Sequence, residues 1–188
     1  FGGKDIRSIP FGQLMGEISY VAQDNFLFDK SIRENIRMGN PDASDEEVEA
    51  AAKAANCHDF IMQLEQGYDT MAGDAGDRLS GGERQRITIA RAMLKQASVI
   101  ILDEATAYAD PENEALIQQA ISKLVVGKSL IVVAHRLNTI RNADQILVVS
   151  NGEIVGRGIQ EELLQSCPLY RKMWQDYAGS MEGGAEDV

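Results

Sequence analysis

Cysteine, basic residues and long apolar runs are all scarce in this sequence of 188 residues. The two cysteines, Cys57 and Cys167, lie far apart without the paired spacing of a zinc site or a disulfide framework, which favours a reducing compartment. Lysine and arginine number 18 against 29 acidic residues, so the formal net charge is −11 and a basic surface for a nucleic-acid backbone is missing. No apolar run approaches the roughly 20 residues that cross a bilayer. We therefore expect no nucleic-acid partner, and any membrane role must come through a partner or through chain outside this sequence.

Apolar residues make up 44% of the chain and charged residues 25%, which is enough for the core of an ordinary globular domain. Short apolar runs predict strands over residues 18–22, 99–102, 130–134, 146–149 and 153–157. Three of the first four runs lack polar alternation, which is typical of strands covered on both faces, and helical patterns separate them. The fold class is therefore α/β with a mostly parallel sheet. Asn151-Gly152 predicts that the last two strands form an antiparallel hairpin at the sheet edge.

The segment of about residues 30–97, between the first two strands, is predicted to be an all-helical insertion. Two capping boxes mark helix starts within it, Ser31 with Glu34 and Ser44 with Glu47. Later helical patterns cover about residues 111–126, 159–165 and 169–177. We expect residues 1–178 to form one partial domain and residues 179–188 to form a flexible acidic tail.

Polar residues of catalytic type follow three of the predicted strands. Gln23 follows the first strand, Asp103 and Glu104 the second, and His135 the third. Ligands bind at the carboxyl ends of the strands in an open parallel sheet. Asp103 and Glu104 point to different sides because they are adjacent, so one can hold a cation while the other faces a water. Taken alone, the pair is better explained by structural roles, with Asp103 as a cap and Glu104 solvated. A lone histidine, likewise, is commonly a core residue.

The motif Leu79-Ser80-Gly81-Gly82-Glu83 precedes a helical pattern that runs to about residue 96. Ser80 with Glu83 is itself a capping box, which is a sufficient structural reason for those two residues. Two glycines within the first turn cost roughly 0.8 to 1 kcal/mol each against alanine. The two glycines have a reason if an anion must come close to the backbone N–H groups at the helix start, because glycine has no side chain to block it. The motif therefore also fits a phosphate site.

A complete phosphate-binding loop is absent from these residues. Gly2-Gly3-Lys4 is followed by Asp5 where the G-x-x-x-x-G-K-[ST] pattern requires Ser or Thr, and the earlier glycine of that pattern would precede Phe1. The sequence thus contains residues suited to hydrolysis without a primary phosphate cradle.

In this order, the motifs resemble the nucleotide-binding domain of ATP-binding-cassette (ABC) transporters, over about residues 2–177. The matching segments are Gln23 for the Q-loop, residues 79–83 for the signature, residues 99–104 for the Walker B strand and catalytic glutamate, residues 107–110 for the D-loop, and His135 for the switch histidine. Residues 31–36, 67–70 and 73–76 look like the exporter branch, where a membrane domain usually precedes the cassette. Met71 stands where exporters often carry a glutamate that contacts that domain. The resemblance implies that the Walker A loop lies before Phe1.

By this resemblance, two cassettes hold two ATP molecules between them, each between the phosphate loop of one cassette and the signature of the other. Residues 80–82 would contact the γ-phosphate bound by the partner. Glu104 would polarise the attacking water, His135 would sense the γ-phosphate, and Gln23 and Asp103 would help to hold Mg²⁺. The nucleotide-binding set implied by the resemblance is Gln23, Ser80, Gly81, Gly82, Glu83, Asp103 and Asp110.

The resemblance implies an ATPase that uses ATP and Mg²⁺ in an exporter at the cytoplasmic face of the cell membrane. Its partners would be a second cassette, identical or not, and the coupling helices of a membrane domain on which the helical insertion docks. One alternative is a soluble ABC ATPase outside transport, against which residues 31–36 and the lack of a long coiled-coil insertion speak. Another is a non-catalytic module that lends its signature to a partner. Glu104 and His135 oppose it in the complete protein, whereas this chain alone, lacking the loop, is expected to be inactive.

Overall fold

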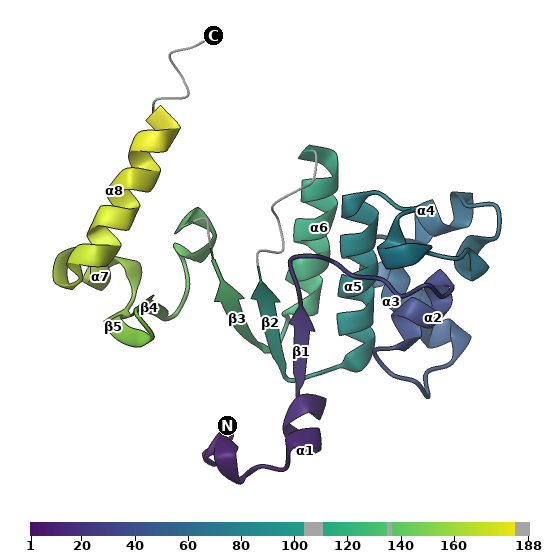
Figure 1. Cartoon of the computed structure of the whole chain (residues 1–188), viewed down its shortest axis with the longest axis horizontal. Coiled ribbons are helices and arrows are strands. Elements are labelled where there is room, and N and C mark those ends of the chain that lie inside the picture. Colours follow the sequence, from purple (N-terminus) through teal and green to yellow (C-terminus); the bar gives the residue numbers. More distant parts are fainter. Residues whose placement is uncertain (104–110, 135–136, 183–188) are drawn as a thin grey trace. The chain divides into compact units, whose positions relative to one another are not determined.

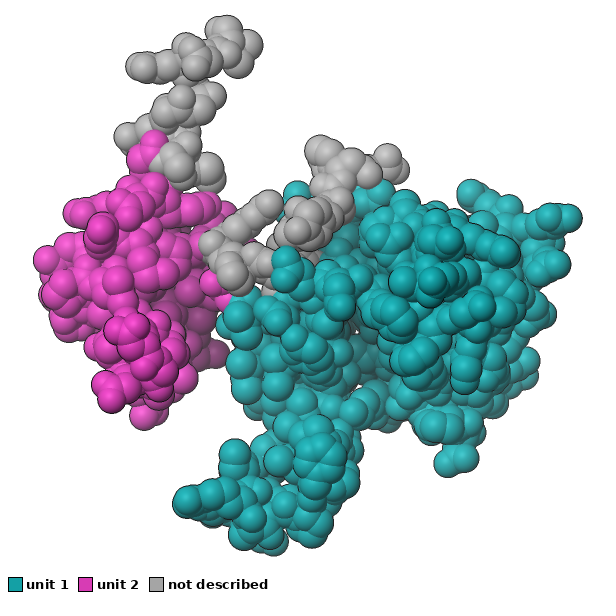
Figure 2. Space-filling model, viewed as in Figure 1, with its two compact units in different colours: residues 1–133 teal, residues 134–188 magenta. Residues whose placement is uncertain are grey.

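The computed structural model describes residues 1–103, 111–134 and 137–182. The chain forms two compact units, residues 1–133 and residues 134–188, which Figure 2 shows in different colours. Three of the candidate residues, Glu104, Asp110 and His135, lie outside the described residues.

A parallel sheet of three strands is the framework of the first unit (Figure 1). Its strands are β1 (Ile18–Val21), β2 (Val99–Asp103) and β3 (Ser129–Val133), in that order. Tyr20 lies opposite Ile101, and Asp103 lies opposite Val133. Because the strands are parallel, their carboxyl ends meet at one edge of the sheet. The prediction of a parallel sheet is thereby confirmed.

One face of β1 and β2 is buried beneath helices. Their buried residues are Ser19, Val21, Ile100 and Leu102. The apolar members join a core with residues of α5 (Gly81–Lys95), including Ile87 and Ala90, and of α6 (Pro111–Leu124), including Ile117 and Leu124. The intervening residues of the two strands point to the other face, in keeping with the two-residue period of a strand.

Strand β3 departs from the expectation that the strands are covered on both faces. All five of its residues are exposed, and Ile131 is 51% exposed. Among the described residues β3 pairs only with β2, so it is the edge strand of this sheet. The apolar run of β3 correctly predicted a strand, but such a run does not show which elements cover the strand.

The interval between β1 and β2 contains four α-helices joined by turns and loops. They are α2 (Ile32–Arg37), α3 (Asp45–Ala54), α4 (His58–Gln63) and α5, with short 3₁₀ turns at Gly67–Asp69 and Asp74–Gly76. Helix α5 packs against α2 and α3 on one side and against β1 and α6 on another. It therefore belongs to both the sheet layer and the helical insertion.

The capping boxes predicted at Ser31 and Ser44 differ in the structure. At α3, the Ser44 hydroxyl accepts from the Glu47 N–H and the Glu47 carboxylate accepts from the Ser44 N–H, so the box is complete. At α2, Ser31 caps the Glu34 N–H, but the Glu34 carboxylate pairs with Arg37 at 2.5 Å. The predicted bond from the Ser31 N–H to the Glu34 carboxylate is therefore wrong, because Arg37, one turn later, competes for that carboxylate.

The amino-terminal segment contains two elements that the sequence analysis did not predict. These are a 3₁₀ turn at Ile6–Ser8 and helix α1 (Phe11–Gly16). Helix α1 begins after Pro10, which offers no side-chain cap, and it has only six residues, including two glycines. Its sequence therefore gives a weak helical signal.

The second unit contains the predicted hairpin. Strands β4 (Ile146–Ser150) and β5 (Glu153–Gly158) are antiparallel, and Asn151 and Gly152 take the positive φ values of 50° and 80° that a tight hairpin turn requires. Helices α7 (Gln160–Ser166) and α8 (Pro168–Glu182) follow. The core of the unit is formed by Leu137, Ile146, Val148, Leu163, Cys167 and Tyr170.

Helix α8 extends past Gly179, where we expected a flexible tail to begin. A glycine near a helix end costs only about 1 kcal/mol, which the helix formers Met181 and Glu182 partly offset. Across the described residues, no helix has both the length and the apolar character needed to cross a membrane.

Gly39, at the end of α2, provides a test of the packing between α2 and α5. A Cβ at this position would overlap the carbonyl oxygen of Arg91, which is backbone and cannot move aside. We expect Gly39→Ala to lower the free energy of unfolding by about 1–3 kcal/mol. Gly12→Ala, in α1 with open space around it, should leave that free energy unchanged or raise it by up to about 1 kcal/mol. Urea unfolding followed by circular dichroism measures both, and equal effects would contradict this packing.

Candidate functional site

Two predicted site residues meet in one pocket at the carboxyl ends of β1 and β2. The pocket is lined by Tyr20, Ala22, Gln23, Asp24 and Asp103. Gln23 comes two residues after β1, and Asp103 is the last residue of β2. The pocket thus combines an amide and two carboxylates at the sheet edge where parallel sheets bind ligands.

Tyr20 is a pocket residue that the sequence analysis did not single out. Its hydroxyl donates a hydrogen bond of 2.7 Å to Oδ2 of Asp103. This hydrogen bond, some desolvation and the negative charges of Asp103 and Asp24 raise the pKa of Tyr20 above its ordinary value. The only sequence signal was a tyrosine in a strand of otherwise aliphatic and small residues, three positions before Gln23.

The signature motif forms the capped start of helix α5. The Ser80 hydroxyl accepts from the Glu83 N–H at 3.3 Å, and the Glu83 carboxylate accepts from the Ser80 N–H at 2.8 Å. Both halves of the predicted capping box are therefore present. Residues 80–83 are not among those that line the pocket at the strand ends, so the structure does not join the two groups in one pocket.

The two glycines of the signature have different surroundings. A Cβ on Gly82 would lie 2.9 Å from Cγ of Asn113 in α6, so close packing is a sufficient reason for glycine there. Among the described residues, a Cβ on Gly81 would meet only a guanidinium nitrogen of Arg84, at 3.9 Å. Packing against the part of the chain that the structure describes therefore does not explain Gly81.

Helix α5 also holds the segment that follows Gln23. Arg91 donates from Nε to the backbone oxygen of Asn35 at 2.8 Å, and from its terminal nitrogens to Oδ1 of Asn35 at 3.1 Å and to the backbone oxygen of Phe26 at 3.4 Å. One turn earlier on α5, the Thr88 hydroxyl lies 3.2 Å from Oδ1 of Asn25. The helix that begins with the signature is thus connected to the loop after β1.

The buried Asn35 side chain completes this connection. Its Oδ1 accepts from the Phe28 N–H at 2.9 Å, and its Nδ2 donates to the backbone oxygens of Phe28, Lys30 and Ser31. Asn35 is fully buried, so its amide depends on these backbone groups for its hydrogen bonds.

The remaining histidine and the cysteines have structural surroundings. His58 Nδ1 lies 2.8 Å from the Tyr68 hydroxyl, which agrees with its interpretation as a structural residue. Cys57 and Cys167 are free and buried, and burial raises the pKa of the Cys57 thiol to about 12. A thiol with so high a pKa is a poor nucleophile at neutral pH.

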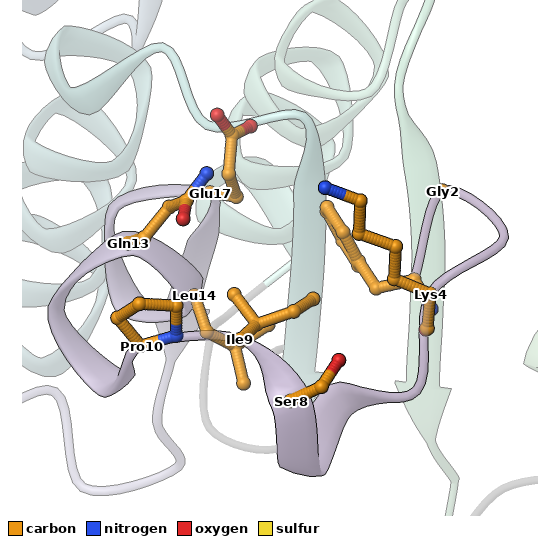
Figure 3. Close-up of a pocket in the computed structure, with 9 residues that line it drawn as sticks. Gly2, Lys4, Ser8, Ile9, Pro10, Gln13, Leu14 and Glu17 are labelled. Carbon is orange, nitrogen blue, oxygen red and sulfur yellow. The ribbon is translucent and has the colours of Figure 1, made fainter.

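A second pocket lies at the amino-terminal segment (Figure 3). Its lining residues are Phe1, Gly2, Lys4, Ser8, Ile9, Pro10, Gln13, Leu14 and Glu17. Figure 3 shows the polar ends of Lys4, Gln13 and Glu17 above the apolar side chains of Ile9 and Leu14. None of the predicted site residues lines this pocket, so it is separate from the candidate site.

Comparison with known protein families identifies the class. The sequence profile described as ABC transporter matches residues 1–107, which is more than half of the 188 residues. The chain therefore belongs to the ABC transporter family, and the resemblance inferred from its motifs is confirmed.

Two curated relatives and one solved structure illustrate the similarity. The chain is 49% identical over 174 residues (93% of it, 20% of the relative) to the mycobactin import ATP-binding/permease protein IrtA of Mycolicibacterium smegmatis. It is also 49% identical over 173 residues (92% of it, 29% of the relative) to the ATP-dependent lipid A-core flippase of Syntrophus aciditrophicus. A bacterial Atm1-family ABC exporter with ATP bound matches all of the chain with a TM-score of 0.84 and 38% identity. The predicted α/β fold class is thus confirmed.

The chain spans only part of these proteins, between 20% and 32% of their lengths. One relative is named for import and another for flipping a lipid, at the same identity to this chain. This segment is therefore shared by transporters with different cargo.

Asn35→Ala tests the connection between α5 and the loop after β1. Loss of the side chain removes its hydrogen bonds to the backbone of residues 28–31 and leaves the Phe28 N–H and one Arg91 N–H without this acceptor, so we expect the free energy of unfolding to fall by about 1–3 kcal/mol. Amide hydrogen exchange in residues 26–31 should accelerate more than in the rest of the unit. The exposed Asn138→Ala is the control and should change neither quantity. Exchange that rises uniformly over the unit would contradict a local role for Asn35.

Proposed function

We propose that the chain is part of the nucleotide-binding domain of an ATP-hydrolysing transporter of the exporter type. The observation that carries this proposal is the pocket that joins Gln23 and Asp103 at the carboxyl ends of β1 and β2. Membership of the ABC transporter family and the 38% identity to an ATP-bound exporter support it. The complete protein would use ATP binding and hydrolysis to move a solute across a membrane. The words permease, flippase and exporter in the names of the similar proteins favour transport over a soluble ATPase.

The donor atoms of the pocket fit Mg²⁺. This cation prefers oxygen ligands and takes one or two carboxylates from a protein, with waters and substrate phosphates completing its shell. Among the described residues, no group of three His, Cys, Asp or Glu side chains could hold a metal ion, so Asp103 would share the cation with phosphate oxygens. Asp103 and Gln23 are the residues that would hold it. When bound, Mg²⁺ neutralises the charge of the phosphates.

Hydrolysis also requires a group that orients the attacking water. We assign this role to Glu104, which directly follows Asp103 in the sequence. His135, two residues after the end of β3, would contact the γ-phosphate, and Asp110 would lie at the interface between cassettes. These three assignments rest on sequence position and on the family resemblance.

The signature turn would bind the phosphate of an ATP held by a second cassette. The backbone N–H groups at the start of α5 and the positive end of its dipole favour an anion. Glu83 keeps the Ser80 cap closed, and Gly81 leaves the approach to the backbone open. The expected partner is therefore a second nucleotide-binding domain.

The helical insertion would dock on the coupling helices of a membrane domain, at the cytoplasmic face of the membrane. Exposed apolar side chains lie on the two segments that meet before α2. Phe26 and Phe28 form an edge-to-face pair with ring centroids 5.1 Å apart, and Met71 bridges to Ser31 in an antiparallel pairing. All three apolar side chains are at least 40% exposed, which suits a surface that another domain covers.

Glu104→Gln tests the catalytic assignment in the complete transporter. The amide keeps the shape of the side chain but loses the charge that orients water or accepts its proton. ATP turnover should fall by on the order of 10² or more, while ATP binding persists and the closed dimer accumulates. Glu65→Gln, an exposed position away from the strand ends, should retain normal turnover. Near-normal turnover of Glu104→Gln would place the catalytic role elsewhere.

Gly81→Ala separates the two interpretations of the signature. Its Cβ meets no close neighbour among the residues that the structure describes, so a role as a helix cap alone predicts unchanged or slightly higher stability and normal ATPase activity. Close approach of a partner's phosphate predicts that the added methyl lowers ATPase activity by on the order of tenfold or more, at equal stability. Gly82→Ala is a poorer probe, because contact with Asn113 would lower its stability as well.

A mixed dimer assigns that loss to the opposite site. One arrangement has Gly81→Ala and a phosphate-loop lysine substitution in the same half, and the other has them in different halves. If the signature acts on the partner's ATP, the split arrangement keeps one composite site intact and retains the higher activity. Lower or equal activity in the split arrangement would oppose binding between halves, provided that the two sites act independently.

A further inference from the structure

Tyr20 and Asp103 are brought together by the register of two strands. Tyr20 lies opposite Ile101 in the parallel pairing, and Asp103 lies two residues further along β2. Because side chains alternate between faces, Tyr20, Ile101 and Asp103 share one face of the sheet. Tyr20 and Asp103 are thus diagonal neighbours across the two strands, a separation that the long tyrosine side chain bridges. The observed Oη to Oδ2 distance is 2.7 Å.

The packing of β1 does not require a tyrosine here. Its neighbours Ser19 and Val21 are buried beneath the helices, at 3% and 1% exposed, whereas Tyr20 is 56% exposed on the opposite face. The ring lines the pocket rather than the core. The hydroxyl is therefore the part of this side chain with a specific contact.

The phenol is a neutral hydrogen-bond donor, and its hydroxyl lies 2.7 Å from Oδ2 of Asp103. A neutral donor holds a carboxylate without adding a positive charge that would repel a cation. An arginine or lysine at this position would both orient and neutralise the same group.

We propose that Tyr20 is a positioning residue for the metal site, whose hydroxyl holds Oδ2 of Asp103 and leaves Oδ1 directed to a divalent cation on the nucleotide phosphates. This inference rests on the proposed function. Hydrogen bonds to a metal-binding carboxylate fix its orientation, and loss of such a bond commonly weakens metal binding by 10–100-fold. Tyr20 itself contacts neither the cation nor the reacting atoms, so it is not a catalytic residue.

The test uses the complete transporter, with Tyr20→Phe compared with wild type. The phenylalanine keeps the ring on the sheet and removes only the hydroxyl. Mn²⁺ binding in the presence of a non-hydrolysable ATP analogue is measured by electron paramagnetic resonance, and binding of the analogue without metal is measured in EDTA. We expect Mn²⁺ affinity to fall by about tenfold, with metal-free nucleotide affinity unchanged.

Two further variants isolate the route through Asp103. Tyr170→Phe, in the second unit, removes a buried hydroxyl that has no hydrogen-bond partner among the described residues, and it should leave Mn²⁺ affinity unchanged. In an Asp103→Asn background, Tyr20→Phe should cause no additional loss of Mn²⁺ affinity, since both changes remove the same ligand arrangement.

The outcomes separate this inference from the proposed function. If the wild-type protein binds Mn²⁺ with the nucleotide and Tyr20→Phe binds it equally well, the role of Tyr20 is wrong and the proposed function stands. Equal losses of Mn²⁺ and metal-free nucleotide affinity would also overturn the role, because the hydroxyl would then support the fold or the nucleotide rather than the metal. A wild-type protein that binds no metal–nucleotide complex would overturn the proposed function, and this inference with it.

Discussion

Burial of helix α5 on several sides is the constraint on which the first unit depends. The helix packs against β1 and α6 in the sheet layer and against α2 and α3 in the helical insertion. Nine of its residues are buried, including the polar Gln85 and Arg86. The same helix begins with the signature turn and reaches the loop after Gln23 through Arg91. A shift of α5 would therefore displace both the signature turn and the loop after Gln23.

Local patterns predicted the elements whose causes are local. The runs at residues 18–22 and 99–102 became β1 and β2 with ends displaced by one residue, because apolar, β-branched runs suit buried strands wherever they lie. The capping boxes at Ser44 and Ser80 involve residues three apart, so the sequence contains all of their geometry. The sequence placed Gln23 and Asp103 at the carboxyl ends of two strands of a parallel sheet, and in the structure both line one pocket.

Contacts between residues that are distant in the sequence could not be predicted, because local patterns do not contain them. Tyr20 and Asp103 are 83 residues apart, and only the register of β1 and β2 makes them diagonal neighbours. The close approach of Asn113 to Gly82 depends on how α6 packs on α5, so the sequence suggested one reason for both signature glycines where the structure gives a separate packing reason for Gly82. The exposure of β3 likewise depends on its neighbours rather than on its composition.

The open edge of β3 has a consequence for the handling of this chain. Four consecutive apolar residues, from Leu130 to Val133, are exposed along a strand that contains neither charge nor proline. Such an edge is a template for pairing with strands of other chains. We therefore expect self-association of these 188 residues in isolation to grow with concentration, and a strand that pairs with β3 would act as a solubilising element as well as a structural one.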